Sequence, residues 1–216
     1  MYLSKLALND RSRQVQAELS NPYQMHRTLM SAFPAVLEGK ERLLYRLETS
    51  RTPPLLVVLV QSWLLPDWSL LEHKGYLLQP AQTKPFDPQF QARQVLAFRL
   101  VANPTRRLKS ASEDVPGKRI SLYRSEQQEE WIKRKALQHG FSLLNVQVTS
   151  LSDQFAFKKE KVEDTEQLMK ITHYGVRFDG ILQIEDSGLF ATALAGGIGS
   201  AKGFGFGMLS LARPAF

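Results

Sequence analysis

The chain has 216 residues, of which 43% are hydrophobic and 23% are charged, and its net charge is +7. That length suits one large domain or two of about 100 residues, and the hydrophobic content excludes a wholly disordered chain. Without cysteine, disulfides, cysteine-ligated zinc and thiol catalysis are excluded, which fits a cytoplasmic protein. We find no signal peptide and no membrane-spanning apolar run, so we expect no membrane partner. The basic charge favours a polyanion such as nucleic acid, although a basic soluble protein is the simpler alternative.

The first part of the chain predicts the element order β-α-β-β-α-β. Residues 2–8 carry apolar side chains on both faces, which is typical of a buried strand. A helix follows because Asn21 or the serine before it can cap it, Pro22 fits the first turn, and Met25 and Leu29 recur at helical spacing. The remaining elements are strands at 42–49 and 55–63, a short helix at 66–73, and a weak strand followed by a proline-rich connection within 75–86.

The same order begins again near residue 93. Its strands are expected at 94–103, 142–159, 168–186 and 206–212, and its helices at 125–141 and 187–197. We expect Ser125 to cap the first of these helices and Gly140 to end it, and the polar stretch 104–124 to be a basic loop. The sequence therefore predicts an α+β protein of two tandem ferredoxin-like (βαββαβ) domains with antiparallel sheets, at residues 1–88 and 89–216.

A glycine run at residues 196–207 contains six glycines and Lys202. It is not a dinucleotide fingerprint, because Lys202 stands where the third glycine is required. A Walker loop is excluded too, because a strand-like segment follows where a helix is needed. The glycines form a Gly-Ile-Gly triplet and, five residues later, a Gly-Phe-Gly triplet, which allows backbone N–H groups to approach phosphate oxygens closely. The pattern alone leaves open a phosphate-binding loop or a mobile connection.

Tyr23 and His26 are three residues apart at the start of the first expected helix, so they share one face. A phenol beside an imidazole can act as a general acid–base pair without a metal ion. The alternative is that both are ordinary packing and surface residues. No histidine lies at metal-ligand spacing from another, and neither H-E-x-x-H nor G-x-S-x-G occurs, so we expect no metal site and no cofactor.

Basic residues gather in three segments of the second half. Two lie in the loop 104–124, and the third is the sequence FKKEK at the tip of an expected hairpin. Loop cations bind mainly phosphates, and a basic hairpin can enter a nucleic-acid groove. A solvated turn is the alternative for any one segment, but three of them in a basic chain favour nucleic acid. The residues are Arg106, Arg107 and Lys109, then Lys118, Arg119 and Arg124, then Lys158, Lys159 and Lys161.

Four segments stand in the order MYLSKLAL, NPYQMHRTL, FRLVANPTRR and GIGSAKGFGFGMLSLA, and span essentially the whole chain. Together they resemble the CasE family, the type I-E CRISPR repeat endoribonucleases of the repeat-associated mysterious protein superfamily. The resemblance implies a prokaryotic enzyme that binds the stem-loop of CRISPR repeat RNA and cuts precursor CRISPR RNA at the 3′ base of the stem. It also implies cleavage without metal, a 2′,3′-cyclic phosphate and a 5′-hydroxyl as products, and a lasting place beside the other Cascade subunits.

On this resemblance, Tyr23 and His26 match the catalytic pair of the family, in either order of acid and base. Close relatives can carry a basic residue about one turn after the histidine, where this chain has Met-Ser-Ala. Arg27 or Lys202 is then expected to stabilise the charge on the transition-state phosphate. The variable segment 103–107 is expected to become ordered on RNA. The residues implied to contact RNA are Arg27, Arg106, Arg107, Lys158, Lys159, Lys161, Gly197, Gly199, Lys202, Gly203, Gly205 and Gly207.

Two other functions fit the same residues. A non-catalytic module of the same fold would bind the RNA hairpin but never shorten it. A general ferredoxin-like nucleic-acid or ribosome-associated protein would not prefer a CRISPR hairpin to a shuffled one, because phosphate contacts alone do not discriminate between sequences.

Overall fold

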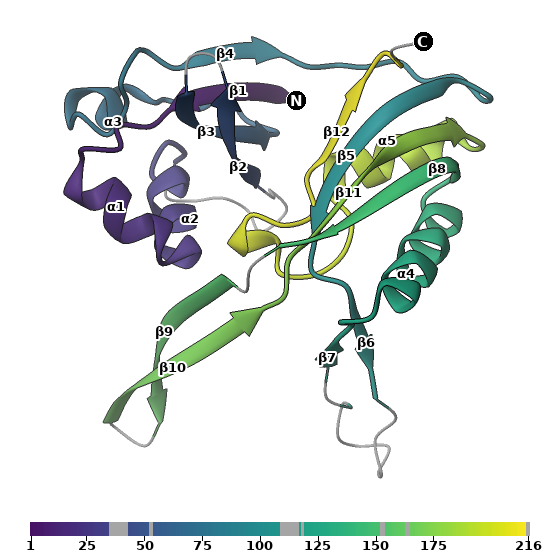
Figure 1. Ribbon diagram of the computed structural model, residues 1–216. Coiled ribbons are helices and arrows are strands. Elements are labelled where there is room, and N and C mark those ends of the chain that lie inside the picture. The colour runs from purple at the N-terminus through teal and green to yellow at the C-terminus, as the bar shows by residue number, and fades with distance from the viewer. Residues whose placement is uncertain are drawn as a thin grey trace. The chain divides into compact units, whose positions relative to one another are not determined.

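The computed structural model describes residues 1–34, 43–51, 54–108, 117, 119–151, 154–162 and 165–214 (Figure 1). Lys109 and Lys118 of the predicted basic segments lie outside these ranges, and residues 154–162 and 165–171 are described by their backbone. The chain forms two compact units. Unit 1 comprises Met1–Gln89, Gln154–Thr172 and Lys202–Met208, and unit 2 comprises Phe90–Asp153, His173–Ala201 and Leu209–Phe216. The division into domains 1–88 and 89–216 stays a prediction.

Unit 1 is built on a four-stranded antiparallel sheet in the order β2-β3-β1-β4. Its strands are β1 (Tyr2–Ala7), β2 (Leu44–Arg51), β3 (Pro54–Ser62) and β4 (Gln82–Pro85), and its helices are α1 (Arg13–Leu19), α2 (Pro22–Met30) and α3 (Ser69–His73). The first and third strands are central, as the predicted ferredoxin-like connection requires. The strand expected within 75–86 lies at its C-terminal end, because β4 pairs with Tyr2–Lys5 whereas Leu77 makes only an isolated bridge to Leu8.

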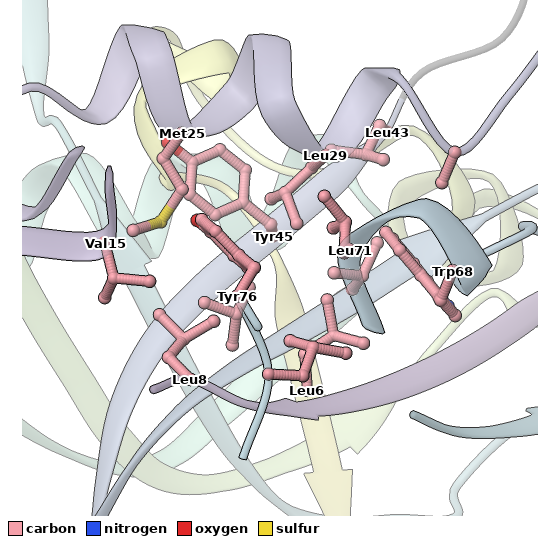
Figure 2. Packing of buried hydrophobic residues seen from close by; sticks show 14 residues of the cluster. Leu6, Leu8, Val15, Met25, Leu29, Leu43, Tyr45, Trp68, Leu71 and Tyr76 are labelled. Carbon is pink, nitrogen blue, oxygen red and sulfur yellow. The ribbon is translucent and has the colours of Figure 1, made fainter. Parts of the chain in front are cut away.

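The core of unit 1 joins the helices to one face of this sheet (Figure 2). Met25 and Leu29 of α2 are buried in it, as their helical spacing predicts, together with Leu6 of β1 and Trp68 beside α3. Each fully buried leucine of this kind stabilises the fold by about 1.5–3 kcal/mol relative to leaving it exposed. The core therefore fixes α2 against the sheet and determines which of its side chains point elsewhere.

Unit 2 repeats the arrangement with the sheet order β12-β5-β11-β8. Its sheet strands are β5 (Val95–Ala102), β8 (Phe141–Ser150), β11 (Val176–Ile184) and β12 (Leu209–Ala212), and its helices are α4 (Ser125–Gln138) and α5 (Ser187–Gly196). Trp131 of α4 stacks on Phe178 of β11 at 5.8 Å between ring centroids, and Phe190 of α5 meets the ring of Phe141. Both halves thus have the predicted antiparallel ferredoxin-like sheet.

Two long predicted strands are each divided in the structure. The stretch 142–159 contains β8 and β9 (Gln154–Val162), and 168–186 contains parts of β10 (Thr165–His173) and β11. The pairing of β11 with β5 and β8 begins at Val176, so the preceding residues have left the sheet. Instead β9 and β10 pair with each other as a separate two-stranded ribbon (Figure 1). The sequence pattern does not reveal this division, because side chains alternate with a period of two in the sheet and in the ribbon alike.

Three local features also differ from expectation. The chain has a helix before α2, because α1 buries Val15 and Glu18 in a stretch for which no element was predicted. The expected basic loop begins and ends in paired strands, β6 (Thr105–Arg107) and β7 (Arg119–Ser121). Ser125 is not the cap of α4: Arg124 holds that position, and the buried Gln128 amide instead donates to the carbonyls of residues 122 and 123.

Candidate functional site

Helix α2 presents Tyr23 and His26 together. Pro22 occupies its first turn, where a missing N–H breaks no helical bond, and Asn21 stands at the N-cap position. Because Met25 and Leu29 face the core, Tyr23 and His26 are only half-buried and lie on a different side of the helix. The predicted pair therefore shares one partly accessible face of α2.

The segment Lys202–Met208, here called the glycine segment, belongs to unit 1 and lies against this face of α2. A side-chain carbon at Gly203 would be 3.8 Å from the ring of His26, and the rings of Tyr23 and Phe204 are 6.0 Å apart between centroids. The segment starts with one 3-10 turn, η1 (Lys202–Phe204), and continues through Gly205 and Gly207 at φ of 83° and 90°. Only glycine adopts such values without strain, which explains the second Gly-x-Gly triplet.

Buried contacts hold the far end of the glycine segment. Phe206 is fully buried and Met208 is 3% exposed. The guanidinium of Arg46 on β2 donates to the Met208 carbonyl at 3.2 Å while forming an ion pair with Glu48 at 2.7 Å. Because Arg46 is itself buried, this pair gives a fixed anchor rather than a surface contact. Lys202 and Gly203 are therefore presented by a segment that is fastened to the core.

Burial lowers the pKa of His26 below its ordinary value of 6.5. The imidazole is therefore neutral at pH 7 and can accept a proton. Tyr45 of β2 lies beside it, with ring centroids 6.2 Å apart, and donates a hydrogen bond to the carbonyl of Pro22 at 2.7 Å. The site thus combines a neutral imidazole in His26, a phenol in Tyr23 and a backbone turn rich in glycine.

Sequence reasoning missed the buried carboxylate of Glu18 near the end of α1. It accepts hydrogen bonds from Tyr76 and Thr28, each at 2.6 Å, and from the Gln14 amide at 2.8 Å. Thr28 is part of α2, so this network ties the helix that carries His26 to α1. The one available signal was the pair Gln14 and Glu18 at helical spacing, which gives no indication of burial by itself.

The other predicted RNA-binding residues of unit 1 are Arg27 and the lysines of β9. Arg27 follows His26 on α2 and is exposed. The backbone of β9, which contains Lys158, Lys159 and Lys161, runs near α2. The structure therefore brings the predicted basic ribbon and the predicted catalytic helix into the same unit.

In unit 2 the predicted RNA contacts lie at two places. Arg106 and Arg107 are exposed on β6. Gly197 has φ of 71° and Gly199 has φ of 95°, and a side chain at Gly199 would be 3.2 Å from the Trp131 ring. The first Gly-x-Gly triplet therefore serves close packing as well as chain direction.

A polar cluster follows the end of β5 in unit 2. The buried Asn103 amide donates to Nδ1 of His173 at 3.0 Å, and Ser200 donates to the Asn103 carbonyl at 3.4 Å. Burial lowers the pKa of His173. Asn103 is the first residue of the segment 103–107, whose conformation was expected to vary. The hydrogen bonds of this cluster therefore hold the first residue of that segment in place.

Within the described ranges, no group of three or more His, Asp or Glu side chains is placed to hold a metal ion. None of the helices in these ranges is both long and apolar enough to cross a membrane.

Comparison with known proteins places the chain in a family. The model of the family described as "CRISPR associated protein" matches residues 1–213. The chain is 40% identical to the CRISPR-associated endoribonuclease Cse3 of Thermus thermophilus, over 98% of this chain and 100% of that protein. It is 28% identical to the CRISPR system Cascade subunit CasE of Escherichia coli, over 98% and 99%.

Among solved structures, the chain is similar to the CRISPR endoribonuclease Cse3 bound to a 19-nucleotide RNA. The TM-score is 0.82 and the identity is 38%, with 99% of this chain and 100% of that chain covered. The chain therefore belongs to the CRISPR-associated protein family of Cse3 and CasE, as the four sequence segments predicted.

Proposed function

We propose that this protein is an endoribonuclease that binds the stem-loop of CRISPR repeat RNA and cleaves precursor CRISPR RNA into guide RNA. We further propose that it stays bound to its product as a subunit of Cascade. The observation that carries the proposal is the placement of His26 and Tyr23 on one face of α2, with the glycine segment against them. The chain that carries this arrangement is 40% identical to an endoribonuclease. Two relatives support the proposed substrate and complex: one is named a Cascade subunit, and another is solved bound to RNA.

The proposed chemistry uses the RNA as its own nucleophile. A base removes the proton of the 2′-hydroxyl, the oxygen attacks the adjacent phosphorus, and the bond to the 5′-oxygen of the next nucleotide breaks as an acid protonates that oxygen. The products are a 2′,3′-cyclic phosphate and a 5′-hydroxyl, and no metal or cofactor is needed. The lowered pKa of His26 favours it as the base, which leaves the Tyr23 hydroxyl to donate the second proton.

Charge on the five-coordinate phosphorus needs stabilisation by nearby donors. Arg27 follows His26 directly, and Lys202 begins the turn whose next residue lies against the His26 ring. Gly203, Gly205 and Gly207 carry no side chains themselves, which allows a phosphate to come close to the backbone at these positions. We propose Lys202 and Arg27 as the cationic groups of the site.

Recognition of the stem is proposed for the two basic ribbons and for the first Gly-x-Gly triplet. The β9–β10 ribbon contains Lys158, Lys159 and Lys161, and a two-stranded ribbon is suited to a nucleic-acid groove. The β6–β7 ribbon carries the exposed Arg106 and Arg107. Gly197 and Gly199 shape the loop ahead of the glycine segment. These residues are expected to control affinity and salt dependence more than the rate of the chemical step.

The test measures single-turnover cleavage of the cognate repeat RNA in EDTA. We expect His26→Ala and Tyr23→Phe each to slow cleavage by about 10²–10⁴-fold, with RNA affinity kept, since each removes one proton-transfer group. His73→Ala is the matched control, because His73 is exposed on α3 and its Nδ1 hydrogen-bonds the Ser69 carbonyl of its own helix. An RNA with a 2′-deoxy sugar at the cleavage site should bind without being cut.

Three results would contradict the proposal. Normal cleavage by His26→Ala would remove the assigned base. Loss of activity in EDTA would require a metal ion. Wild-type protein that binds the repeat but never shortens it would be the non-catalytic module instead.

A further inference from the structure

Tyr45 is a buried tyrosine that the proposed chemistry does not use. It is 1% exposed and comes from β2, where it pairs with Val60 of β3. Its hydroxyl donates to the Pro22 carbonyl at 2.7 Å and lies 3.5 Å from the Gly203 carbonyl. One hydroxyl thus reaches the first turn of α2 and the glycine segment, which are separated by about 180 residues in the chain.

The ring of Tyr45 fills the space between the same two elements. Its centroid is 6.2 Å from that of His26, at an interplanar angle of 41°. A side-chain carbon at Gly205 would come within 3.2 Å of its edge. The ring therefore sets how near the glycine segment can approach α2, and a side chain at Gly205 would press against it.

The hydroxyl of Tyr45 remains protonated under any ordinary condition. Burial raises its pKa far above the usual value of 10, and the negative charge of Glu18 raises it further. It therefore acts as a permanent hydrogen-bond donor and takes no part in proton transfer.

The Pro22 carbonyl is also part of the backbone hydrogen bonding of α2. In an α-helix the carbonyl of residue i accepts the N–H of residue i+4, and for Pro22 that residue is His26. Tyr45 thus donates to the carbonyl that positions the backbone of His26.

We propose that Tyr45 is a positioning residue for cleavage, which fixes the His26 imidazole relative to Gly203 and the turn around it. The inference rests on the proposed role of His26 as base. A misplacement of about 1 Å costs about 10²-fold in rate, because proton transfer needs the donor and acceptor within hydrogen-bonding distance. The hydroxyl therefore matters for the rate of cleavage far more than for RNA binding.

The experiment compares Tyr45→Phe with Tyr76→Phe, each of which removes one hydroxyl from the same core. Tyr76 is also 1% exposed, but its hydroxyl donates to Glu18 of α1 at 2.6 Å, whereas that of Tyr45 donates to the Pro22 carbonyl of α2. Measured are the single-turnover rate at saturating repeat RNA, the Kd for a 2′-deoxy RNA that cannot be cut, and the midpoint of thermal unfolding. His26→Ala is measured alongside.

We expect Tyr45→Phe to cleave about tenfold or more slowly with a Kd within about twofold of wild type. Tyr76→Phe should lower the unfolding midpoint at least as much, because it removes one of the three donors to the buried Glu18 carboxylate. Its cleavage rate should nevertheless stay within about twofold of wild type. A purely structural role for Tyr45 would instead make the rates follow the unfolding midpoints, and would overturn the inference, as would a wild-type rate in Tyr45→Phe.

A second pair of variants makes the same test without touching the hydroxyl. Gly205→Ala must displace the Tyr45 ring, whereas Gly75→Ala has the same left-handed backbone, at φ of 65°, and nothing within 4 Å. Only Gly205→Ala should lower the rate more than the affinity, and equal rates in the two variants would overturn the inference. If His26→Ala cleaves normally, the base assignment fails. If it is inactive while Tyr45→Phe is unaffected, only the positioning role fails.

Discussion

The buried carboxylate of Glu18 allows a quantitative test of what holds α2 in place. Its side chain is 5% exposed, and the hydroxyl of Tyr76 donates to one carboxylate oxygen while Thr28 and Gln14 donate to the other. Tyr76→Phe removes one donor without changing the ring. The carboxylate then loses a hydrogen bond at a place that water reaches poorly.

The size of the effect follows from the charge and the burial. A hydrogen bond to a charged group contributes about 1.5–3 kcal/mol, and the loss approaches the full amount when the acceptor is buried. We therefore expect Tyr76→Phe to lower the free energy of unfolding of unit 1 by about 2 kcal/mol. Thr28→Val should cost less, about 1 kcal/mol, because the bond from Thr28 is only partly buried and water can replace it.

Hydrogen exchange measured by mass spectrometry reads out the two units separately. A loss of about 2 kcal/mol makes exchange through opening about 30-fold faster in peptides from α1 and α2. Peptides from α4 in unit 2 should be unchanged. Tyr123→Phe is the control, because Tyr123 is 64% exposed and its loss should change stability by less than about 0.5 kcal/mol.

Three results would refute this reasoning. Exchange in α1 and α2 at the wild-type rate would mean that the Glu18 bonds contribute nothing. Equal acceleration in α4 would mean that the variant destabilises the chain as a whole. A larger effect of Thr28→Val than of Tyr76→Phe would reverse the order that burial predicts.

Three further predictions concern pH, salt and packing. Burial lowers the pKa of His26, so the cleavage rate should be level at higher pH and fall only as pH drops through a value below 6.5. A plot of rate against pH with its midpoint at or above 6.5 would contradict this. Replacing both Arg106 and Arg107 by Ala should reduce the slope of log K against log salt for repeat RNA by about 2, measured by titration at several salt concentrations; an unchanged slope would exclude phosphate contacts there. Gly180→Ala should destabilise unit 2 by about 2 kcal/mol or more in urea unfolding, because its methyl group would overlap the backbone carbonyl of Asn145 on β8; a loss below about 0.5 kcal/mol would show that β8 can move aside.

Much of the fold followed from local pattern. The spacing of Met25 and Leu29 predicted α2, and the apolar run at 55–63 predicted β3, because side-chain periodicity reflects local backbone geometry. Two repeats of the same element order then left few ways to pair the strands. What pattern could not reveal was the division of the stretches 142–159 and 168–186 into sheet and ribbon, since period two is the same in both.

For the candidate site, the sequence by itself determined the chemistry that is possible: a basic chain without cysteine, Tyr23 and His26 on one helix face, and a glycine run around Lys202. Only the tertiary structure decided that the glycine segment belongs with α2, that Tyr45 lies between them, and that Glu18 is buried. The physical reason is sequence separation. Helical spacing acts over three or four residues, whereas the contact of Tyr45 with Gly203 spans 158, and burial of a polar side chain depends on whatever the folded chain brings over it.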